Sequence, residues 1–164
     1  LLSPDENRKN IARCTRLLQE ASGAPVRGWL SPRGTSGPEL PRMLCDAGYL
    51  WYGDVFDDDL PYVQRFGEDR IVAIPLATDV NDMPFMKYGA PPRRMLDSFE
   101  ENLVVARAEG RPCIIDATVH AHIFGHPRGA HYFGKIVAQA AAASDVWIAT
   151  RAEIAEFMLK QNAG

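Results

Sequence analysis

Hydrophobic residues in this chain follow two spacings that alternate from one end to the other. Five segments carry them three or four positions apart, which predicts helices. Five shorter segments are almost entirely apolar, which predicts buried strands. The predicted helices are residues 4–22, 39–47, 93–110, 132–143 and 151–161, and the predicted strands are residues 26–32, 49–55, 70–77, 113–123 and 145–150.

The first helix carries both a start and a stop signal. Ser3 can cap it, Pro4 suits its first position, and Glu6 can complete a capping box with Ser3. Gly23 ends it. The residues that we expect on its buried face are Ile11, Cys14, Leu17 and Leu18.

Strands that alternate with helices predict an α/β protein with parallel strands covered by helices, as an open layer or a barrel. At 164 residues the chain fits a single domain, residues 1–164. Functional residues of such folds gather where loops leave the carboxyl ends of the strands. The loops in question are SPRGTSG (31–37), DVFDDDLPY (54–62), TDVNDMPFMKYG (78–89) and HAHIFGHPRG (120–129).

Composition restricts the partners and the compartment. The net charge is −3 and no block of Lys or Arg stands out, which indicates no nucleic-acid partner. The longest apolar run, residues 136–143, is too short to cross a membrane. Three widely spaced cysteines, Cys14, Cys45 and Cys113, are predicted to be small buried hydrophobic residues, and their odd number favours the cytoplasm.

All four histidines lie within residues 119–133. On an extended strand His120 and His122 point to the same side, a spacing that can chelate a metal, although a zinc site needs further ligands. Alternatively, a histidine at a strand end acts as a general acid or base when a carboxylate holds its ring. A purely structural role, with the rings satisfied by backbone carbonyls, remains open for His122 and is favoured for His126 and His131.

The loop DVFDDDLPY could supply that carboxylate, because neighbouring aspartates alter each other's pKa and can orient an imidazole or bind a cation. A solvated acidic turn is the alternative. Arg33 could hold an anionic group, or it could pair with the acidic turn. Aromatic residues flank these loops and would either pack in the core or stack on a sugar or planar substrate: Trp29, Trp51, Tyr52 and Tyr62.

Four motifs in this order, GWLSPRGTS, LCDAGYLWYGDVFDDDLPY, VHAHIFGHPRG and VWIATRAEIAEFM, resemble the polysaccharide deacetylase (NodB homology) superfamily. The likeness is greatest to its cytoplasmic branch of allantoinase-like and peptidoglycan-deacetylase-like amidohydrolases. It extends from about Ser3 to the end of the chain, and it identifies a family without identifying a substrate.

The resemblance implies a distorted parallel (β/α) barrel with its active site at the carboxyl ends of the strands. It also implies metal-dependent hydrolysis of the C–N bond of an N-acylated sugar or related amide, in carbohydrate metabolism, with a divalent metal, usually zinc. By motif, His120 matches the histidine that protonates the leaving amine. Asp58 and Asp59 match the pair that orients it, and Arg33 lies in the third motif. Trp29, Trp51 and Tyr62 are the candidate substrate-binding residues.

Two positions depart from the family pattern: His126 stands in place of Arg, and Ala121 in place of Pro. The resemblance implies that the family's base and metal ligands come from an Asp-Asp motif on the first strand and a His-x-x-x-His motif on the next, both before the segment that this chain resembles. We therefore expect the C-terminal portion of a deacetylase domain, with a barrel incomplete at its N-terminal side.

Three hypotheses follow. The chain is part of a metal-dependent amidohydrolase, with little activity alone; or it binds a sugar or ureide-like ligand without turnover; or His120, His122 and a carboxylate such as Asp58 hold a replacement metal. We expect a small-molecule or oligosaccharide substrate, no membrane partner, and a homo-oligomer, because missing strands leave a sheet edge open. The ring of His120 is expected beside the triple-aspartate turn.

Overall fold

The computed structural model describes residues 2–162. The chain forms two compact units, and each is described by itself. The first unit comprises Leu1–Leu76 and Ala149–Gly164, and the second comprises Ala77–Ile148.

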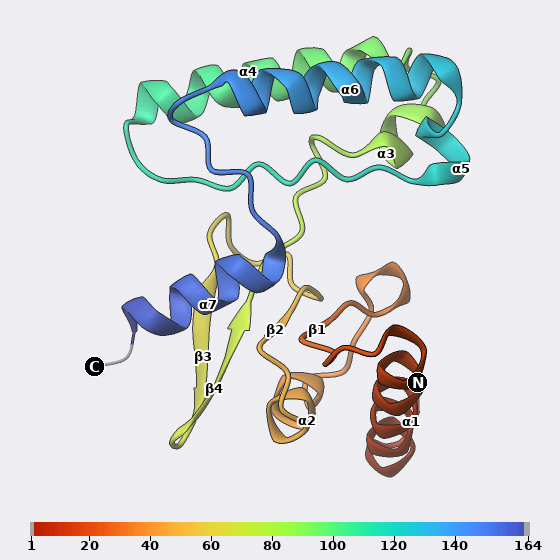
Figure 1. Cartoon of the computed structure of the whole chain (residues 1–164), viewed down its shortest axis with the longest axis vertical. Coiled ribbons are helices and arrows are strands. Elements are labelled where there is room, and N and C mark those ends of the chain that lie inside the picture. Colours follow the sequence, from red (N-terminus) through yellow and green to blue (C-terminus); the bar gives the residue numbers. More distant parts are fainter. Residues whose placement is uncertain (1, 163–164) are drawn as a thin grey trace. The chain divides into compact units, whose positions relative to one another are not determined.

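A four-stranded sheet organises the first unit (Figure 1). Its strands are β1 (Gly28–Trp29), β2 (Trp51–Tyr52), β3 (Tyr62–Phe66) and β4 (Asp69–Ala73), in the spatial order β1-β2-β4-β3. β2 pairs in parallel with both β1 and β4, so the carboxyl ends of these three strands share one edge of the sheet. The sheet is open, which confirms the α/β class and leaves the predicted barrel untested.

β3 and its antiparallel pairing with β4 depart from the prediction. Residues 54–62 were expected to be a loop, but Tyr62 already begins a strand that turns back at Gly67, where φ is 67°. The reason is local, because a short turn can join only antiparallel neighbours. Tyr62 and Phe66 pack into one core cluster and Val63 into the other, and Gly67 after them was the turn signal available in the sequence.

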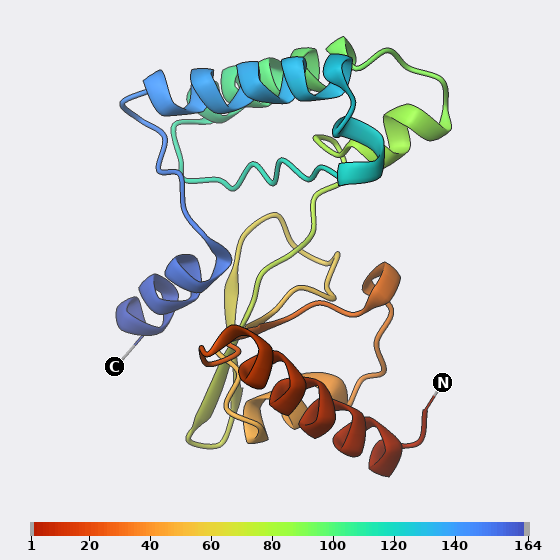
Figure 2. The ribbon, with the colours of Figure 1, turned by 45° about the vertical axis from the view of Figure 1, so that its right-hand side comes forward.

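The α-helices of the first unit begin within one residue of their predicted starts, whereas the 3-10 helix was not predicted. The helices are α1 (Pro4–Ser22), the single-turn 3-10 helix η1 (Pro32–Gly34), α2 (Leu40–Asp46) and α7 (Arg151–Gln161), and α1 and α2 lie side by side (Figure 2). Ser3 and Glu6 form the predicted capping box, and Thr150 and Glu153 form another. Gly23 ends α1 in a left-handed conformation.

The apolar face predicted for α1 is only partly buried. Ile11 is in the core and Cys14 is half-buried, but Leu17 and Leu18 are exposed. The hydrophobic spacing predicted the helix correctly, but the extent of burial depends on what packs against it. Within the first unit α1 contacts α2, a helix of seven residues.

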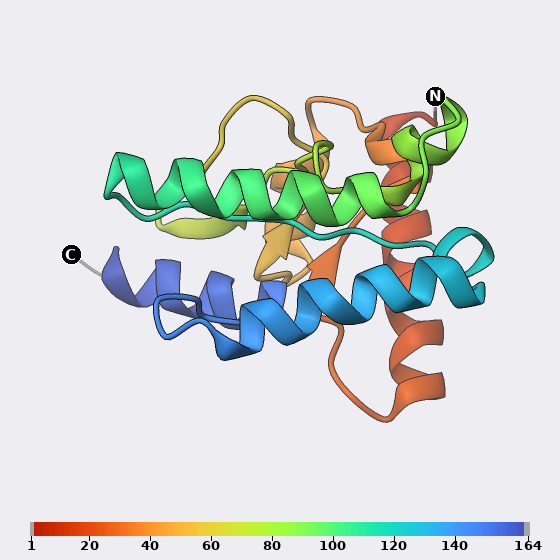
Figure 3. The same ribbon diagram turned by 90° about the horizontal axis from the view of Figure 1, so that it is seen from above.

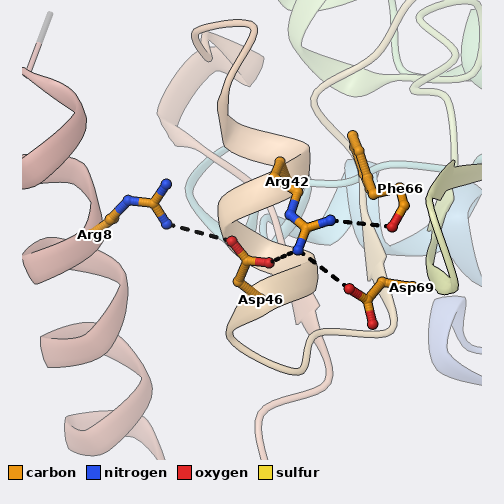
Figure 4. A network of polar contacts seen from close by, with 5 residues as sticks. All are labelled: Arg8, Arg42, Asp46, Phe66 and Asp69. Carbon is orange, nitrogen blue, oxygen red and sulfur yellow. Dashed lines mark hydrogen bonds and ion pairs between the residues drawn. The ribbon is translucent and has the colours of Figure 1, made fainter.

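A network of charged side chains joins α1, α2 and the β3–β4 turn (Figure 4). The guanidinium of Arg42 contacts Asp46 at 2.6 Å and Asp69 at 3.2 Å, and it donates to the carbonyl of Phe66. Arg8 approaches the second oxygen of Asp46 at 3.5 Å. The hydrogen bond from Arg42 holds the pKa of Asp46 below its usual value.

The core of the first unit occupies both sides of the sheet. One cluster lies between the sheet, α1 and α2 and includes Ile11, Leu44, Tyr52 and Ile71. A second cluster, formed by Val72, Ile74 and Ala155, packs α7 against the other side. Alternate residues of β4 thus face opposite layers, as the strand period of two requires.

Helices form most of the second unit: α3 (Asp82–Lys87), α4 (Arg93–Glu109), α5 (Ala121–Phe124) and α6 (Pro127–Ala142). The two long helices α4 and α6 run side by side (Figure 3). Their shared core contains Val80, Met95, Phe99 and Ile136, together with Phe124 from α5. The predicted α4 is confirmed, and α6 begins five residues earlier than predicted because Pro127 occupies its first turn.

Two predicted strands, residues 113–123 and 145–150, are not strands in the structure. A strand needs a ladder of backbone hydrogen bonds to a neighbour. Residues 113–119 are extended, but only Thr118 pairs, in a single parallel bridge with Asn81. Cys113 is exposed rather than buried, whereas Cys14 and Cys45 are half-buried, and all three are free thiols.

The segment predicted as a long loop after β4 contains a helix. Asn81 caps α3 by accepting a hydrogen bond from the Met83 backbone at 3.0 Å. Asn before Asp, with Pro84 in the first turn, was the available signal for a helix start. Among residues 2–162, no helix is both long enough and apolar enough to span a membrane.

Candidate active site

His120 and Asp82 form a close pair in the second unit. His120 is extended and immediately precedes α5, while Asp82 is the first residue of α3. The parallel bridge between Asn81 and Thr118 brings these two helix starts together, because Asn81 directly precedes Asp82 and Thr118 lies two positions before His120. The pair is therefore positioned by backbone hydrogen bonds as well as by its own side chains.

Asp82 accepts two hydrogen bonds from His120. One oxygen lies 2.6 Å from ring atom Nδ1, and the other accepts the backbone N–H of His120 at 2.7 Å. The Asp82 side chain is completely buried, whereas the His120 side chain is 36% exposed. Because a carboxylate accepts hydrogen bonds, this contact places the proton of a neutral His120 ring on Nδ1 and turns Nε2 away from Asp82.

The prediction that a carboxylate holds the His120 ring is thus met by a residue that sequence reasoning missed. Asp82 lies in the loop TDVNDMPFMKYG (78–89), where functional residues were expected, but Asp82 itself was not named as a candidate. Asp58 and Asp59 belong to the first unit and His120 to the second. Their predicted roles at His120 therefore remain predictions.

His122 lies beside His120 but does not share its contact with Asp82. The two rings meet edge to face, with centroids 5.7 Å apart. His122 is the second residue of α5 rather than a strand residue. The predicted strand, on which the metal pair was based, is therefore wrong. Within residues 2–162, no group of three or more His, Cys, Asp or Glu side chains is arranged to hold a metal ion.

His126 and His131 lie at α6 and both are exposed, so the structural role predicted for them stays a prediction. His126 is the residue that caps the start of α6, without a side-chain hydrogen bond to the helix. His131 is exposed on α6 and packs edge to face against Tyr132 at 5.1 Å. The backbone of His126 accepts the N–H of Ala130 at 2.9 Å, as the first turn of α6 requires.

The loops after β1 and β2 form a second group of candidate residues, in the first unit. Asp54 follows β2 and accepts the backbone N–H of Ser31 at 2.7 Å, so it joins the two loops. Trp29 donates from its indole nitrogen to the Ser31 hydroxyl at 2.9 Å. Arg33 is exposed and, within residues 2–162, forms no ion pair with the acidic turn.

The acidic turn presents its three carboxylates differently. Asp58 accepts the backbone N–H groups of Asp59 and Leu60, which makes it the residue that organises the turn. Asp57 accepts a hydrogen bond from the Tyr62 hydroxyl at 3.1 Å. Phe56 and the three aspartates line an open pocket.

The candidate aromatic residues are partly engaged in packing. Trp29 lies edge to face with Tyr49 at 5.8 Å, and Trp51 lies under the guanidinium of Arg151 at 5.6 Å. Burial, aided by the negative charge of Asp57, raises the pKa of Tyr62. Burial raises the pKa of Tyr52 still further, and its hydroxyl donates to Gln64 at 2.8 Å. Tyr52 and Tyr62 are therefore neutral donors near pH 7.

Solved structures similar to this chain confirm the resemblance found in the sequence. A protein of Pseudomonas aeruginosa assigned as a polysaccharide deacetylase is 25% identical with a TM-score of 0.88, covering 99% of this chain and 56% of that one. An allantoinase is 24% identical with a TM-score of 0.87, covering 99% and 56%. A protein of Mycobacterium smegmatis assigned to the polysaccharide deacetylases is 25% identical with a TM-score of 0.85, covering 98% and 58%.

The chain therefore has the fold of part of a polysaccharide deacetylase domain, and it spans just over half the length of these structures. No protein-family model matches the chain. No curated protein matches its sequence significantly.

Proposed function

We propose that this chain contributes the proton-donating side of a C–N hydrolase active site, with His120 as the donor and Asp82 as the residue that positions it. The observation that carries the proposal is the 2.6 Å contact between Nδ1 of His120 and the buried Asp82 carboxylate. The fold shared with deacetylases and an allantoinase supports the reaction class, since those enzymes cleave C–N bonds.

His120 acts through Nε2 in this proposal. When the ring is protonated, both nitrogens carry hydrogen, and Asp82 holds the one on Nδ1. Once water has added to the carbonyl carbon, the Nε2–H transfers its proton to the nitrogen of the tetrahedral intermediate as the C–N bond breaks. The bonding electrons leave with that nitrogen as a neutral amine, and the carbonyl re-forms as a carboxylic acid. Asp82 fixes the ring during the transfer, because its second oxygen also holds the His120 backbone.

The described residues do not form a metal site. A catalytic zinc ion takes three protein ligands, and residues 2–162 provide no such group. We therefore assign no step to a metal and no ligand role to His120 and His122. Zinc remains the expected cofactor of a complete family domain.

The test is hydrolysis by the purified chain of a chito-oligosaccharide and of allantoin, with zinc added or omitted. We expect weak turnover at most, lowered about 100-fold or more in His120→Ala. Asp82→Asn should lower kcat with little change in KM. His131→Ala is the matched control, because His131 is an exposed α6 residue. Wild-type turnover in His120→Ala would show that the proposal is wrong.

Binding without turnover is the second candidate function, and the absence of a three-ligand group among residues 2–162 favours it. In that case calorimetry detects binding of the oligosaccharide or of allantoin, with no acetate released from the oligosaccharide and no ring-opened product from allantoin at any zinc concentration. Trp29→Ala and Tyr62→Phe should then weaken binding. Neither binding nor turnover of either compound would contradict both functions.

We also propose that the chain acts in the cytoplasm and associates with a second copy. The free thiols support a reducing compartment. β1 lies at one edge of the sheet, and large apolar side chains such as Leu18, Val104 and Val105 are exposed, which supports association. Light scattering tests this proposal, and a monodisperse monomer would rule out the homo-oligomer.

A further inference from the structure

Arg33 has an unusual backbone conformation. Among the residues that the structure describes, it is the one residue other than glycine with a positive φ, at 63° with ψ at 16°. This left-handed conformation is unfavourable for arginine because the Cβ atom approaches the following carbonyl oxygen. Residues held in this way persist where surrounding contacts fix them, and they gather at functional sites.

Contacts at Ser31 fix the turn that contains Arg33. The carbonyl of Ser31 accepts the N–H of Gly34 at 2.9 Å, which closes η1, and the Ser31 hydroxyl accepts from Trp29 at 2.9 Å. Both partners belong to the same loop as Ser31 or to the strand before it. The hydrogen bond from Ser31 N–H to Asp54 Oδ1, at 2.7 Å, is different, because it ties the turn to the loop after β2.

Packing brings the two loops close on either side of this hydrogen bond. A Cβ atom at Gly53 would lie 3.0 Å from Cδ1 of Leu30, so glycine allows the approach beside Asp54. A Cβ atom at Gly34 would lie 2.9 Å from the ring of Phe56, so Phe56 covers the residue that follows Arg33. The hydrogen bond between Asp54 and Ser31 is part-buried, so water competes with it less than at the surface.

The buried side chain of Asp54 lowers the stability of the fold. Its side chain is 9% exposed, and its Oδ2 atom is buried without a hydrogen-bond partner in the described part of the chain. An unpaired buried carboxylate oxygen destabilises a protein, so stability alone does not account for an aspartate at this position. A role at a site does account for it.

We propose that Asp54 is the positioning residue for Arg33. Through the Ser31 N–H, Asp54 holds η1 closed and keeps Arg33 left-handed, so that its guanidinium is presented at the carboxyl ends of β1 and β2. What Arg33 does there rests on the proposed function, but the constraint on its loop does not.

Limited digestion with trypsin tests the constraint directly, because trypsin cleaves the Arg33–Gly34 bond. Mass spectrometry follows this cleavage and, as an internal reference, cleavage after Arg107 in the second unit. In Asp54→Ala we expect cleavage after Arg33 to be about tenfold faster, because proteolysis follows local opening. Cleavage after Arg107 should be unchanged.

Two further variants separate positioning from general destabilisation. Glu39→Ala removes an exposed acidic residue near the same loop and should leave both cleavage rates unchanged. Asp54→Asn keeps an oxygen that accepts the Ser31 N–H, and it should restore protection of Arg33 to within about twofold of wild type.

Unchanged cleavage after Arg33 in Asp54→Ala would overturn the proposal. Equal acceleration after Arg33 and Arg107 would also overturn it, because Asp54 would then hold the whole fold rather than one loop. Failure of Asp54→Asn to restore protection would exclude the hydrogen bond as the cause. None of these results depends on turnover, so an inactive chain leaves the test intact.

Discussion

The buried carboxylate of Asp82 accepts two hydrogen bonds from His120, one from the backbone N–H at 2.7 Å and one from ring atom Nδ1 at 2.6 Å. Because Asp82 holds both the main chain and the ring, the side-chain torsions of His120 are fixed relative to α3. A histidine held in this way presents one defined nitrogen, Nε2, to its surroundings. This geometry, rather than the number of histidines in the segment, makes His120 the residue on which the proposed function depends.

Replacing Asp82 should release the ring. In Asp82→Ala, the backbone N–H and the Nδ1–H of His120 lose their acceptor in a buried setting, which should cost about 1–3 kcal/mol of unfolding free energy. Long-range proton–nitrogen NMR should show one neutral tautomer of His120 in wild type and a mixture in Asp82→Asn. Asp79→Asn, an exposed aspartate of the same loop, is the control, and a mixture already present in wild type would contradict the geometry.

Glycine at position 28 should be required for strand pairing. A Cβ atom there would lie 1.9 Å from the indole of Trp51, so Gly28→Ala must displace Trp51 or separate β1 from β2. Such overpacking should lower the unfolding free energy by about 1–3 kcal/mol. Urea denaturation measures the change. Gly37→Ala, with nothing within 4 Å of the added atom, should stay close to wild type, and equal effects of the two would refute the explanation.

The start of α7 should weaken in acid. Hydrogen bonds from the backbone and side chain of Thr150 hold the pKa of Glu153 below its usual value of 4.5. Because the folded-state pKa is lowered, the stabilisation is present above the usual pKa and is lost as pH falls through the folded-state pKa. Glu153→Gln should therefore melt at a lower temperature than wild type at pH 7.

The difference between Glu153→Gln and wild type should disappear at about pH 2, where both side chains are neutral. Thermal melts followed by circular dichroism measure both points. Glu68→Gln, in the exposed β3–β4 turn, serves as the control. A difference that persists in acid would mean that the capping box is not its cause.

The core of the second unit should depend on Met95. This side chain is fully buried between α4 and its neighbours, so Met95→Ala should cost about 2–5 kcal/mol through lost burial and the cavity left behind. Chemical denaturation provides the measurement. Val104→Ala, on the same helix but 66% exposed, should have a small effect, and comparable losses would contradict the assignment of this core.

Local signals in the sequence predicted the long helices but not the short helices α3 and α5. The capping box of α1 and the glycine that ends α1 act within one helical turn, so they operate before any tertiary contact forms. Strands β1, β2 and β4 overlap predicted strands, although β1 and β2 are only two residues long. The segments 113–123 and 145–150 carry the same signal, but a strand also needs a neighbour to pair with, and a local pattern does not specify one.

The candidate site, too, was predicted only in part from the sequence. The sequence by itself predicted His120 as the candidate proton donor, because all the histidines lie within residues 119–133, and it determined that the chain resembles part of a deacetylase. Only the tertiary structure decided which carboxylate holds that histidine: Asp82 lies 38 positions away along the chain. Its neighbours in NDMPF carry no sign of the contact, because a bridge between distant backbone segments creates it. Such a pairing is a property of how the chain packs, which no spacing along the sequence records.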